Sequence, residues 1–267
     1  MSGEDRHQAF DPGQAHQARM YDYMLGGRDN YAADRAAAAE WVKADPSTPF
    51  TVRANRAFLG RAIRYLAAEG GIRQFLDIGA GIPTAGNTHQ VAQEIAPDSR
   101  VVYVDYDPVV VAHGRALLTS SEAGAIEYVD SDLRDPGAIL DQAGRLLDFT
   151  RPVAITLVAI LHAIPGSDDP HGIVSALLDA VPSGSYLALS HLGSDLVAHG
   201  ARDEMEGISR RSMRQRISAR GREEVARFFD GTDLVDPGVV RLEQWRPDAT
   251  APAGQESFLW CALGRKR

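Results

Sequence analysis

Acidic side chains follow two segments that have the composition of buried strands. Asp105 ends the Val-rich segment 100–105, and Asp132 comes shortly after the apolar segment 126–129. A carboxylate at the end of a second strand can accept hydrogen bonds from both ribose hydroxyls of a nucleoside. A carboxylate at the end of a third strand can accept one from the exocyclic amine of adenine, with Leu133 beside the ring. Each Asp alone also suits a turn or a helix cap, but their succession predicts a nucleoside site.

A glycine-containing loop precedes these carboxylates. The apolar segment 74–78 runs into Gly79 and Gly81, and glycines at such a turn let the backbone approach a ligand closely. A dinucleotide site needs a further glycine three residues after the second, and Thr84 stands there after Pro83. The lysine of a P-loop is also missing. S-adenosylmethionine carries no phosphates, so the loop predicts this cofactor; a nucleotide-dependent oxidoreductase is the alternative.

Apolar segments alternate with helical patterns along most of the chain. This alternation predicts an α/β, Rossmann-like fold with a doubly wound, mostly parallel sheet and right-handed crossovers. Ligands of such sheets bind beyond the carboxyl ends of the strands, where the glycines and carboxylates lie. Strands are expected at 74–78, 100–105, 126–129, 153–161 and 185–190, with an antiparallel hairpin of 239–244 and 258–263 at the end. Helices are expected at 34–43, 53–69, 88–95, 108–118, 135–147, 172–180 and 196–229.

The N-terminal part has a pattern of its own. We expect residues 1–69 to form a helical cap integral to the domain, and residues 70–267 to form the Rossmann-like core. Tyr21 lies in a stretch that mixes aromatic and polar residues around two glycines, which suits a lid over a cofactor. Arg53 can pair with the carboxylate of the cofactor, because guanidinium groups bind carboxylates well. The alternative is a capped helix with a solvated face.

The chain resembles the class I S-adenosylmethionine-dependent methyltransferases. Asp77-Ile78-Gly79-Ala80-Gly81 is similar to their first motif, Asp105 to their ribose-binding carboxylate and Asp132 to their adenine contact. The resemblance implies a Rossmann-like sheet of seven strands with an antiparallel last strand, and S-adenosylmethionine as the cofactor. The sequence departs from the class at Pro83, where a third glycine is common.

A closer resemblance covers the whole chain. It is to an actinobacterial family of S-adenosyl methyltransferases, formerly a domain of unknown function, and it rests on segments 19–30, 53–59, 82–87 and 185–191. The family brings no assigned substrate. Together the residues and the resemblance give an expected set of cofactor-binding residues: Asp77, Gly79, Gly81, Asp105, Tyr106, Asp107, Asp132, Leu133, Arg53 and Tyr21.

Candidate catalytic residues follow two of the expected strands. Methyl transfer needs a general base only if the acceptor arrives protonated. His162 and His191 are candidate bases, because an unperturbed histidine pKa near 6.5 suits that role. Tyr21 is a third candidate. The alternative for each histidine is a buried side chain that shapes the pocket or binds the backbone.

Composition limits the partners. The chain has 267 residues and a net charge of -8, which argues against a nucleic-acid partner. The arginines between 202 and 227 could attract an acidic acceptor or nucleic acid, but such a run is usually a solvated face. The single cysteine, Cys261, excludes an internal disulfide and a multi-cysteine zinc site. With no secretory signal and no apolar segment of about 20 residues, a soluble, cytoplasmic protein without a membrane partner is expected.

These observations predict an S-adenosylmethionine-dependent methyltransferase that acts on a small-molecule acceptor. A non-catalytic protein that binds S-adenosylmethionine as a regulator is the second alternative. No metal is expected. The acceptor, the methylated atom and the oligomeric state are not specified by the sequence.

Overall fold

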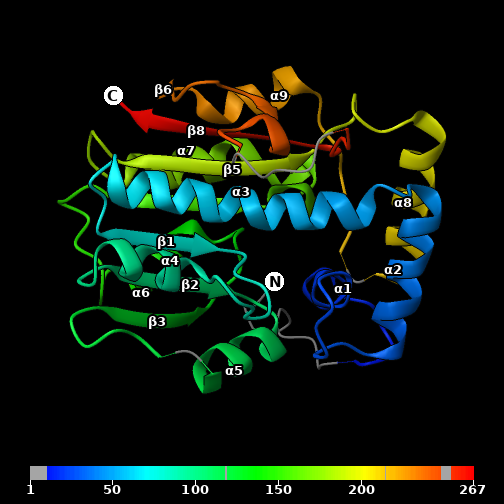
Figure 1. Ribbon diagram of the computed structural model, residues 1–267, viewed down its shortest axis with the longest axis horizontal. Coiled ribbons are helices and arrows are strands. Elements are labelled where there is room, and N and C mark those ends of the chain that lie inside the picture. The colour runs from blue at the N-terminus through cyan, green and yellow to red at the C-terminus, as the bar shows by residue number, and fades with distance from the viewer. Residues whose placement is uncertain (1–10, 118, 214, 248–253) are drawn as a thin grey trace.

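A mixed β-sheet runs through the middle of the molecule (Figure 1). The structure is a computed structural model that describes residues 11–117, 119–213, 215–247 and 254–267. Within these residues the sheet has eight strands in the order β3-β2-β1-β4-β5-β8-β6, and β7 pairs with β8. Strands β1 to β5 are parallel, and β8 is antiparallel to β5. The strands are β1 Gln74–Ile78, β2 Arg100–Asp105, β3 Ala125–Asp130, β4 Ala154–Val158, β5 Tyr186–Leu192, β6 Thr232–Leu234, β7 Val240–Arg241 and β8 Leu259–Lys266.

Helices bury both faces of the sheet, as the nearly continuous apolar strands predict. Successive strand residues point to opposite faces. Phe75 packs in one apolar cluster with Phe58 of α3 (Thr48–Ala68), and Leu76 packs in the other with Ile139 of α6 (Pro136–Ala143). The predicted α/β fold is therefore confirmed. The helices that follow the first four strands are α4 Thr88–Ile95, α5 Pro108–Leu117, α6 Pro136–Ala143 and α7 Pro170–Asp179, and α9 Arg222–Ala226 comes before β6.

The N-terminal residues form three helices with two different locations. They are α1 Gln17–Met24, α2 Ala32–Ala44 and α3 Thr48–Ala68. Helix α3 lies along the sheet, whereas α1, α2 and α8 (His199–Ser212) gather beyond the carboxyl ends of the parallel strands (Figure 1). Pro49 lies in the first turn of α3, where a missing N–H costs nothing, so this helix begins earlier than predicted. The division of the chain at residue 69 into a helical cap and a Rossmann-like core stays a prediction. Helix α3, which lies before that division, packs in the same apolar cluster as the sheet.

Two predicted elements in the C-terminal part are wrong. The helix expected over 196–229 is interrupted between α8 and α9. There the backbone N–H of Ser218 donates to His162 O at 2.7 Å, and that of Arg220 donates to Leu192 O at 3.0 Å. These tertiary bonds replace helical ones. The strand expected at 239–244 has only the two residues of β7, while β6 was not expected, so two short strands pair with β8 instead of one.

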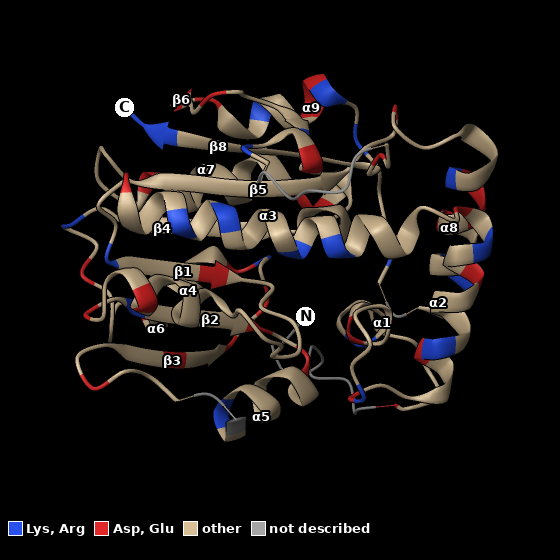
Figure 2. Ribbon diagram, viewed as in Figure 1, with Lys and Arg blue, Asp and Glu red and all other residues tan. Residues whose placement is uncertain are grey.

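The arginine-rich stretch 202–227 is divided among different environments. On α8, Arg211 pairs with Glu204 at 3.2 Å and Arg210 with Glu206 at 3.8 Å, so basic and acidic side chains alternate there (Figure 2). Arg220 is buried and donates hydrogen bonds to backbone carbonyls. In the part that the structure describes, the stretch is therefore not one continuous basic face.

Candidate active site

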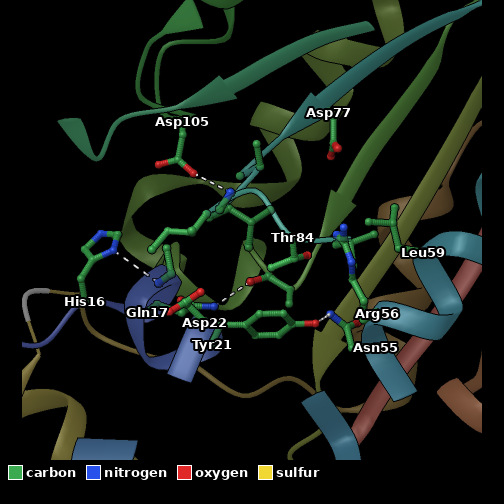
Figure 3. A pocket seen from close by; sticks show the side chains of 18 of the residues that line it. His16, Gln17, Tyr21, Asp22, Asn55, Arg56, Leu59, Asp77, Thr84 and Asp105 are labelled. Carbon is green, nitrogen blue, oxygen red and sulfur yellow. Dashed lines mark hydrogen bonds between the residues drawn. The ribbon is translucent and has the colours of Figure 1, made fainter. Parts of the chain in front are cut away.

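A cavity opens where the carboxyl ends of β1, β2 and β4 meet. The strand order reverses between β1 and β4, and ligands of doubly wound sheets bind at this point. The cavity, including the part open to solvent, has a volume of ≈ 810 Å³. We call it the switch-point cavity (Figure 3). Its lining consists of His16, Gln17, Ala18, Tyr21, Asp22, Asn55, Arg56, Leu59, Asp77, residues 79–82, Thr84, Asp105, Tyr106, residues 158–160 and Gln215.

The glycine loop forms the floor of this cavity. Gly79 has φ 78°, and its N–H donates to Val104 O at 2.8 Å. A Cβ at Gly79 would lie 2.7 Å from Cβ of Ile160, so only glycine permits this approach of the loop to the residues after β4. Gly81 has φ 66° and open space around it. Helix α4 does not begin until Thr88, so no helix N-terminus follows the loop as in a dinucleotide site.

Asp105 ends β2 and faces the loop (Figure 3). One carboxylate oxygen accepts from the N–H of Gly81 at 2.9 Å and the other from the N–H of Asp107 at 3.0 Å. Burial raises the pKa of Asp105, although these two hydrogen bonds and the charge of His16 oppose the shift. Each oxygen can accept a further hydrogen bond. The two backbone bonds thus orient a bidentate acceptor toward the cavity.

Asp77 lies on β1, deeper in the same cavity. Its two oxygens accept from the hydroxyls of Thr88 and Thr156, each at 2.6 Å. Burial raises the pKa of Asp77, and the two threonine hydrogen bonds work against that shift. The carboxylate therefore joins the start of α4 to β4 and holds the glycine loop between them.

Helix α1 supplies a wall of the cavity with Tyr21. Its hydroxyl donates to Val52 O and accepts from the side chain of Asn55, both at 3.0 Å. Burial raises the pKa of Tyr21, so this phenol is protonated at neutral pH. The neighbouring Asp22 accepts from the N–H of Asp29 at 2.9 Å, and a Cβ at Gly27 would lie 1.9 Å from its Oδ1. The Gly26-Gly27 turn is thereby folded back onto α1.

Arg56 on α3 lines the cavity, whereas Arg53 does not. Arg53 is exposed on the same helix. The guanidinium of Arg56 donates from Nη2 to Asn87 Oδ1 at 3.0 Å and to Ala85 O at 3.2 Å. Its buried Nε has no hydrogen-bond partner among the described residues. An arginine therefore lies at the cavity, three residues beyond the one expected from the sequence.

Tyr106 and Asp107 follow Asp105 but have different surroundings. Tyr106 lines the cavity, and its hydroxyl contacts Gln215 and His16. Asp107 does not line it. Its carboxylate pairs instead with His16 and Arg19, each at 3.0 Å. Although burial acts to raise the pKa of Asp107, the hydrogen bond and charge of His16 and the charge of Arg19 lower it.

The residues expected at the adenine lie outside the lining of the cavity. Asp132 pairs with Arg134 at 3.1 Å, and Arg134 also binds Asp168 at 2.7 Å. Leu133 is buried in the apolar cluster that contains α6 and α7. The chain after β3 thus turns Leu133 into the core.

The two candidate histidines are both buried and neutral. Nε2 of His162 lies 2.6 Å from the side-chain amide of Gln17, which also donates to Ala159 O at 2.7 Å. Because that amide nitrogen can only donate, Nε2 accepts and the proton lies on Nδ1. Burial, followed by the charge of Arg220, lowers the pKa of His162 to about 4. His162 does not line the switch-point cavity.

His191 lies still deeper, on β5. Its Nδ1 donates to Leu192 O at 2.9 Å, and its Nε2 accepts from Arg220 at 2.7 Å. Burial and the neighbouring His162 lower its pKa well below the usual value. Both ring nitrogens are engaged, and His191 lines neither this cavity nor the second one described below.

The comparison with family models matches residues 3–267 to a family described as S-adenosyl methyltransferase. The chain belongs to this family. Membership of this family, together with the fold, identifies the protein as an S-adenosylmethionine-dependent methyltransferase. S-adenosylmethionine is therefore the cofactor. The predicted family, enzyme class and cofactor are confirmed, and the alternatives of an oxidoreductase and a non-catalytic regulator are not retained.

Two solved structures are similar to the methyltransferase in both sequence and fold, and a third is similar in fold alone. A DUF574 family protein from Streptomyces avermitilis is 43% identical, with 96% of this chain and 99% of that chain covered and a TM-score of 0.92. A candidate methyltransferase from Thermobifida fusca is 41% identical, with 96% of both chains covered and a TM-score of 0.86. Human N-acetylserotonin methyltransferase, in complex with S-adenosylmethionine, is 12% identical, with 94% of this chain and 63% of that chain covered and a TM-score of 0.50. This last likeness shows the fold alone. No curated protein matches the chain.

Several lining residues of the methyltransferase were not expected from the sequence. Asn55 lies three residues before the buried Phe58, so the period of α3 could have placed it on the inner face. His16, Gln17 and Gln215 come from segments far apart in the chain. Their contacts depend on the packing of α1 against the segment after α8, and no local pattern signals them.

Proposed function

We propose that the switch-point cavity binds S-adenosylmethionine, with its ribose at Asp105. The support is the carboxylate itself, which is oriented by two backbone N–H groups and keeps an acceptor site on each oxygen. Two adjacent hydroxyls can donate to such a carboxylate. Gly79 and Gly81 leave room beside it for the backbone to approach the cofactor.

Arg56 is the proposed partner of the cofactor's carboxylate. Its buried Nε has no partner among the described residues, and an unpaired buried donor is costly unless a ligand satisfies it. Arg53 is exposed and plays no part in this proposal. The cavity lining gives no support for Asp132 and Leu133 at the adenine, so the proposal does not extend to them. Tyr106, which follows Asp105 in the chain, does line the cavity.

The protein contributes to the reaction by aligning the cofactor with the acceptor and by excluding water from the site. The bound cofactor supplies a methyl group on a positively charged sulfur. Tyr21 stays protonated because burial raises its pKa, and His162 stays neutral with its Nε2 already occupied. We propose that neither they nor His191 act as general bases. Because α1 and α3 wall the cavity, a small-molecule acceptor can reach the bound cofactor more easily than a macromolecule.

No helix of the described residues is long and apolar enough to cross a bilayer. The cytoplasmic location stays a prediction.

Calorimetric titration tests the cofactor site. We expect S-adenosylmethionine and S-adenosylhomocysteine to bind in the micromolar range, about −8 kcal/mol, and NAD not to bind. Binding of NAD in place of the other two would overturn the proposal. Loss of binding in a folded Asp105→Ala variant would locate the site at the end of β2.

A further inference from the structure

A second cavity lies directly beside the switch-point cavity. The two share Gln17, Tyr21 and Ala159 in their linings. Gln17 and Tyr21 project from α1 (Figure 3), and Ala159 follows β4 with φ 57°. A non-glycine residue in this conformation is strained, and such residues gather at functional sites. A ligand in the second cavity would therefore reach the boundary with the cofactor site at the end of β4.

The lining of the second cavity is apolar. It contains no Asp, Glu, Lys or Arg among the described residues, and its histidine is neutral. Burying a charge there would be very costly, so its occupant is uncharged. Methionine sulfurs and aromatic edges make favourable contacts with aromatic rings. The residues that supply these contacts are Met20, Met24, Met213, Trp41 and Phe258.

Polar atoms in this lining are left without partners. Nδ1 of His162, Nε1 of Trp41 and Oε1 of Gln17 are buried and have no hydrogen-bond partner among the described residues. His162 is 5% exposed. Since Nε2 of His162 accepts from Gln17, its Nδ1 carries a proton to donate. Unpaired buried groups of this kind are costly, and a ligand whose polar group accepts a hydrogen bond would satisfy the Nδ1–H of His162.

We propose that the second cavity binds the methyl acceptor, and that the acceptor is an uncharged, largely apolar aromatic molecule whose polar group accepts a hydrogen bond from His162. This inference rests on the proposed function, because it takes the switch-point cavity as the cofactor site. It assigns His162 to orienting the acceptor and not to removing its proton. Gln17 spans both cavities and holds the ring of His162 in the tautomer that donates.

The test is calorimetric titration of the full chain, saturated with S-adenosylhomocysteine, with naphthol and coumarin as uncharged probes whose oxygens can accept a hydrogen bond. Naphthoate serves as the charged counterpart of naphthol. We expect at least one uncharged probe to bind, and naphthoate to bind at least about tenfold more weakly than naphthol. Binding of S-adenosylhomocysteine without any uncharged probe would overturn the inference and leave the proposed function intact. Failure of S-adenosylhomocysteine itself to bind would instead count against the proposed function.

A matched pair of variants locates the probe. Met24 lines the second cavity, whereas its neighbour Tyr23 is 41% exposed and lines neither cavity. Met24→Trp should weaken probe binding at least about tenfold and leave S-adenosylhomocysteine binding unchanged, and Tyr23→Trp should change neither. His162→Phe should weaken naphthol but not naphthalene, because only naphthol can accept from Nδ1. Equal probe affinity in the Met24→Trp and Tyr23→Trp variants would overturn the assignment of the cavity.

Discussion

Arg19 on α1 and Asp107 after β2 form an ion pair at 3.0 Å, and each side chain is 4% exposed. The same guanidinium binds Asp34 on α2 at 3.0 Å. His16 binds Asp107 from the start of α1, also at 3.0 Å. One buried cluster of charges therefore ties both helices to the end of the strand that carries Asp105. The position of α1, and with it that of Gln17 and Tyr21, depends on this cluster.

Asp107→Asn is expected to lower the free energy of unfolding by about 3 kcal/mol, because removal of one member of a buried ion pair leaves the other uncompensated. Urea unfolding at neutral pH measures this. Asp98→Asn is the matched control: Asp98 pairs with Arg73 at 3.5 Å, and its side chain is 67% exposed. Exposed pairs contribute about 0–1 kcal/mol, so equal losses in the two variants would contradict the prediction.

Asp105→Ala is expected to weaken S-adenosylmethionine binding at least about tenfold, since hydrogen bonds to a charged group contribute roughly 1.5–3 kcal/mol each. Calorimetry on the folded variant measures it. Asp130→Ala is the control, because Asp130 is the register partner of Asp105 on β3 but is exposed and outside the cavity lining. An unchanged affinity in the Asp105→Ala variant would remove Asp105 from the cofactor site.

The sheet, and the placing of the loop glycines and Asp105 at its carboxyl edge, could be predicted because local patterns specify them. Apolar segments with helices between them indicate a parallel sheet, and a carboxylate that ends a strand must lie at the carboxyl edge. The location of Asp105 and of the loop glycines at this edge follows from these patterns alone. The interrupted helix after residue 212 could not be predicted in this way. Its sequence suits a helix, but Ser218 and Arg220 bind the backbone of β5 and of the segment that follows β4.

The arginine that lines the switch-point cavity shows a second limit of prediction from sequence. Arg53 and Arg56 lie on one helix and both suit a carboxylate, and only the rotation of α3 against the sheet brings Arg56 to the cavity. His162 shows a third. Its position after β4 suggests a base, but a pKa depends on burial and on neighbours such as Gln17 and Arg220, which come from other parts of the chain.

Arg56→Gln is expected to weaken S-adenosylmethionine binding about tenfold, because an ion pair with the cofactor's carboxylate is lost. Methylthioadenosine lacks the carboxylate, so its affinity should not change. Parallel titrations of both ligands measure the difference. Arg53→Gln should leave both affinities at the wild-type level, since Arg53 is exposed and lines no part of the cavity. A uniform loss for both ligands would show that Arg56 acts on the loop and not on the carboxylate.

Gly79→Ala is expected to destabilise the protein more than Gly81→Ala. Both glycines have positive φ, and an alanine in that conformation costs roughly 1–2 kcal/mol. At Gly79 the new Cβ also meets Ile160 at 2.7 Å, whereas at Gly81 it meets open space. Overpacking adds about 1–3 kcal/mol. Thermal and urea unfolding compare the two variants, and equal stability would mean that the loop does not lie against Ile160 as described.

The neutral, buried state of His162 makes the protein less stable in acid. Burial first, and then Arg220, lower its pKa from 6.5 to about 4. Between pH 6.5 and pH 4 the unfolded chain takes up a proton at His162 that the folded chain excludes. The free energy of unfolding therefore keeps its full value, as far as His162 is concerned, above pH 6.5 and decreases as the pH falls toward 4. The loss amounts to about 3 kcal/mol.

Comparison with a His162→Gln variant isolates this effect from those of the other histidines. The variant cannot take up a proton at this position, so its stability should fall less steeply over the same range. Urea unfolding at several pH values measures the difference between the two proteins, which should move in the variant's favour by up to about 3 kcal/mol between neutral pH and pH 4. Parallel pH profiles would mean that folding leaves the pKa of His162 near 6.5, and would contradict its burial as a neutral side chain.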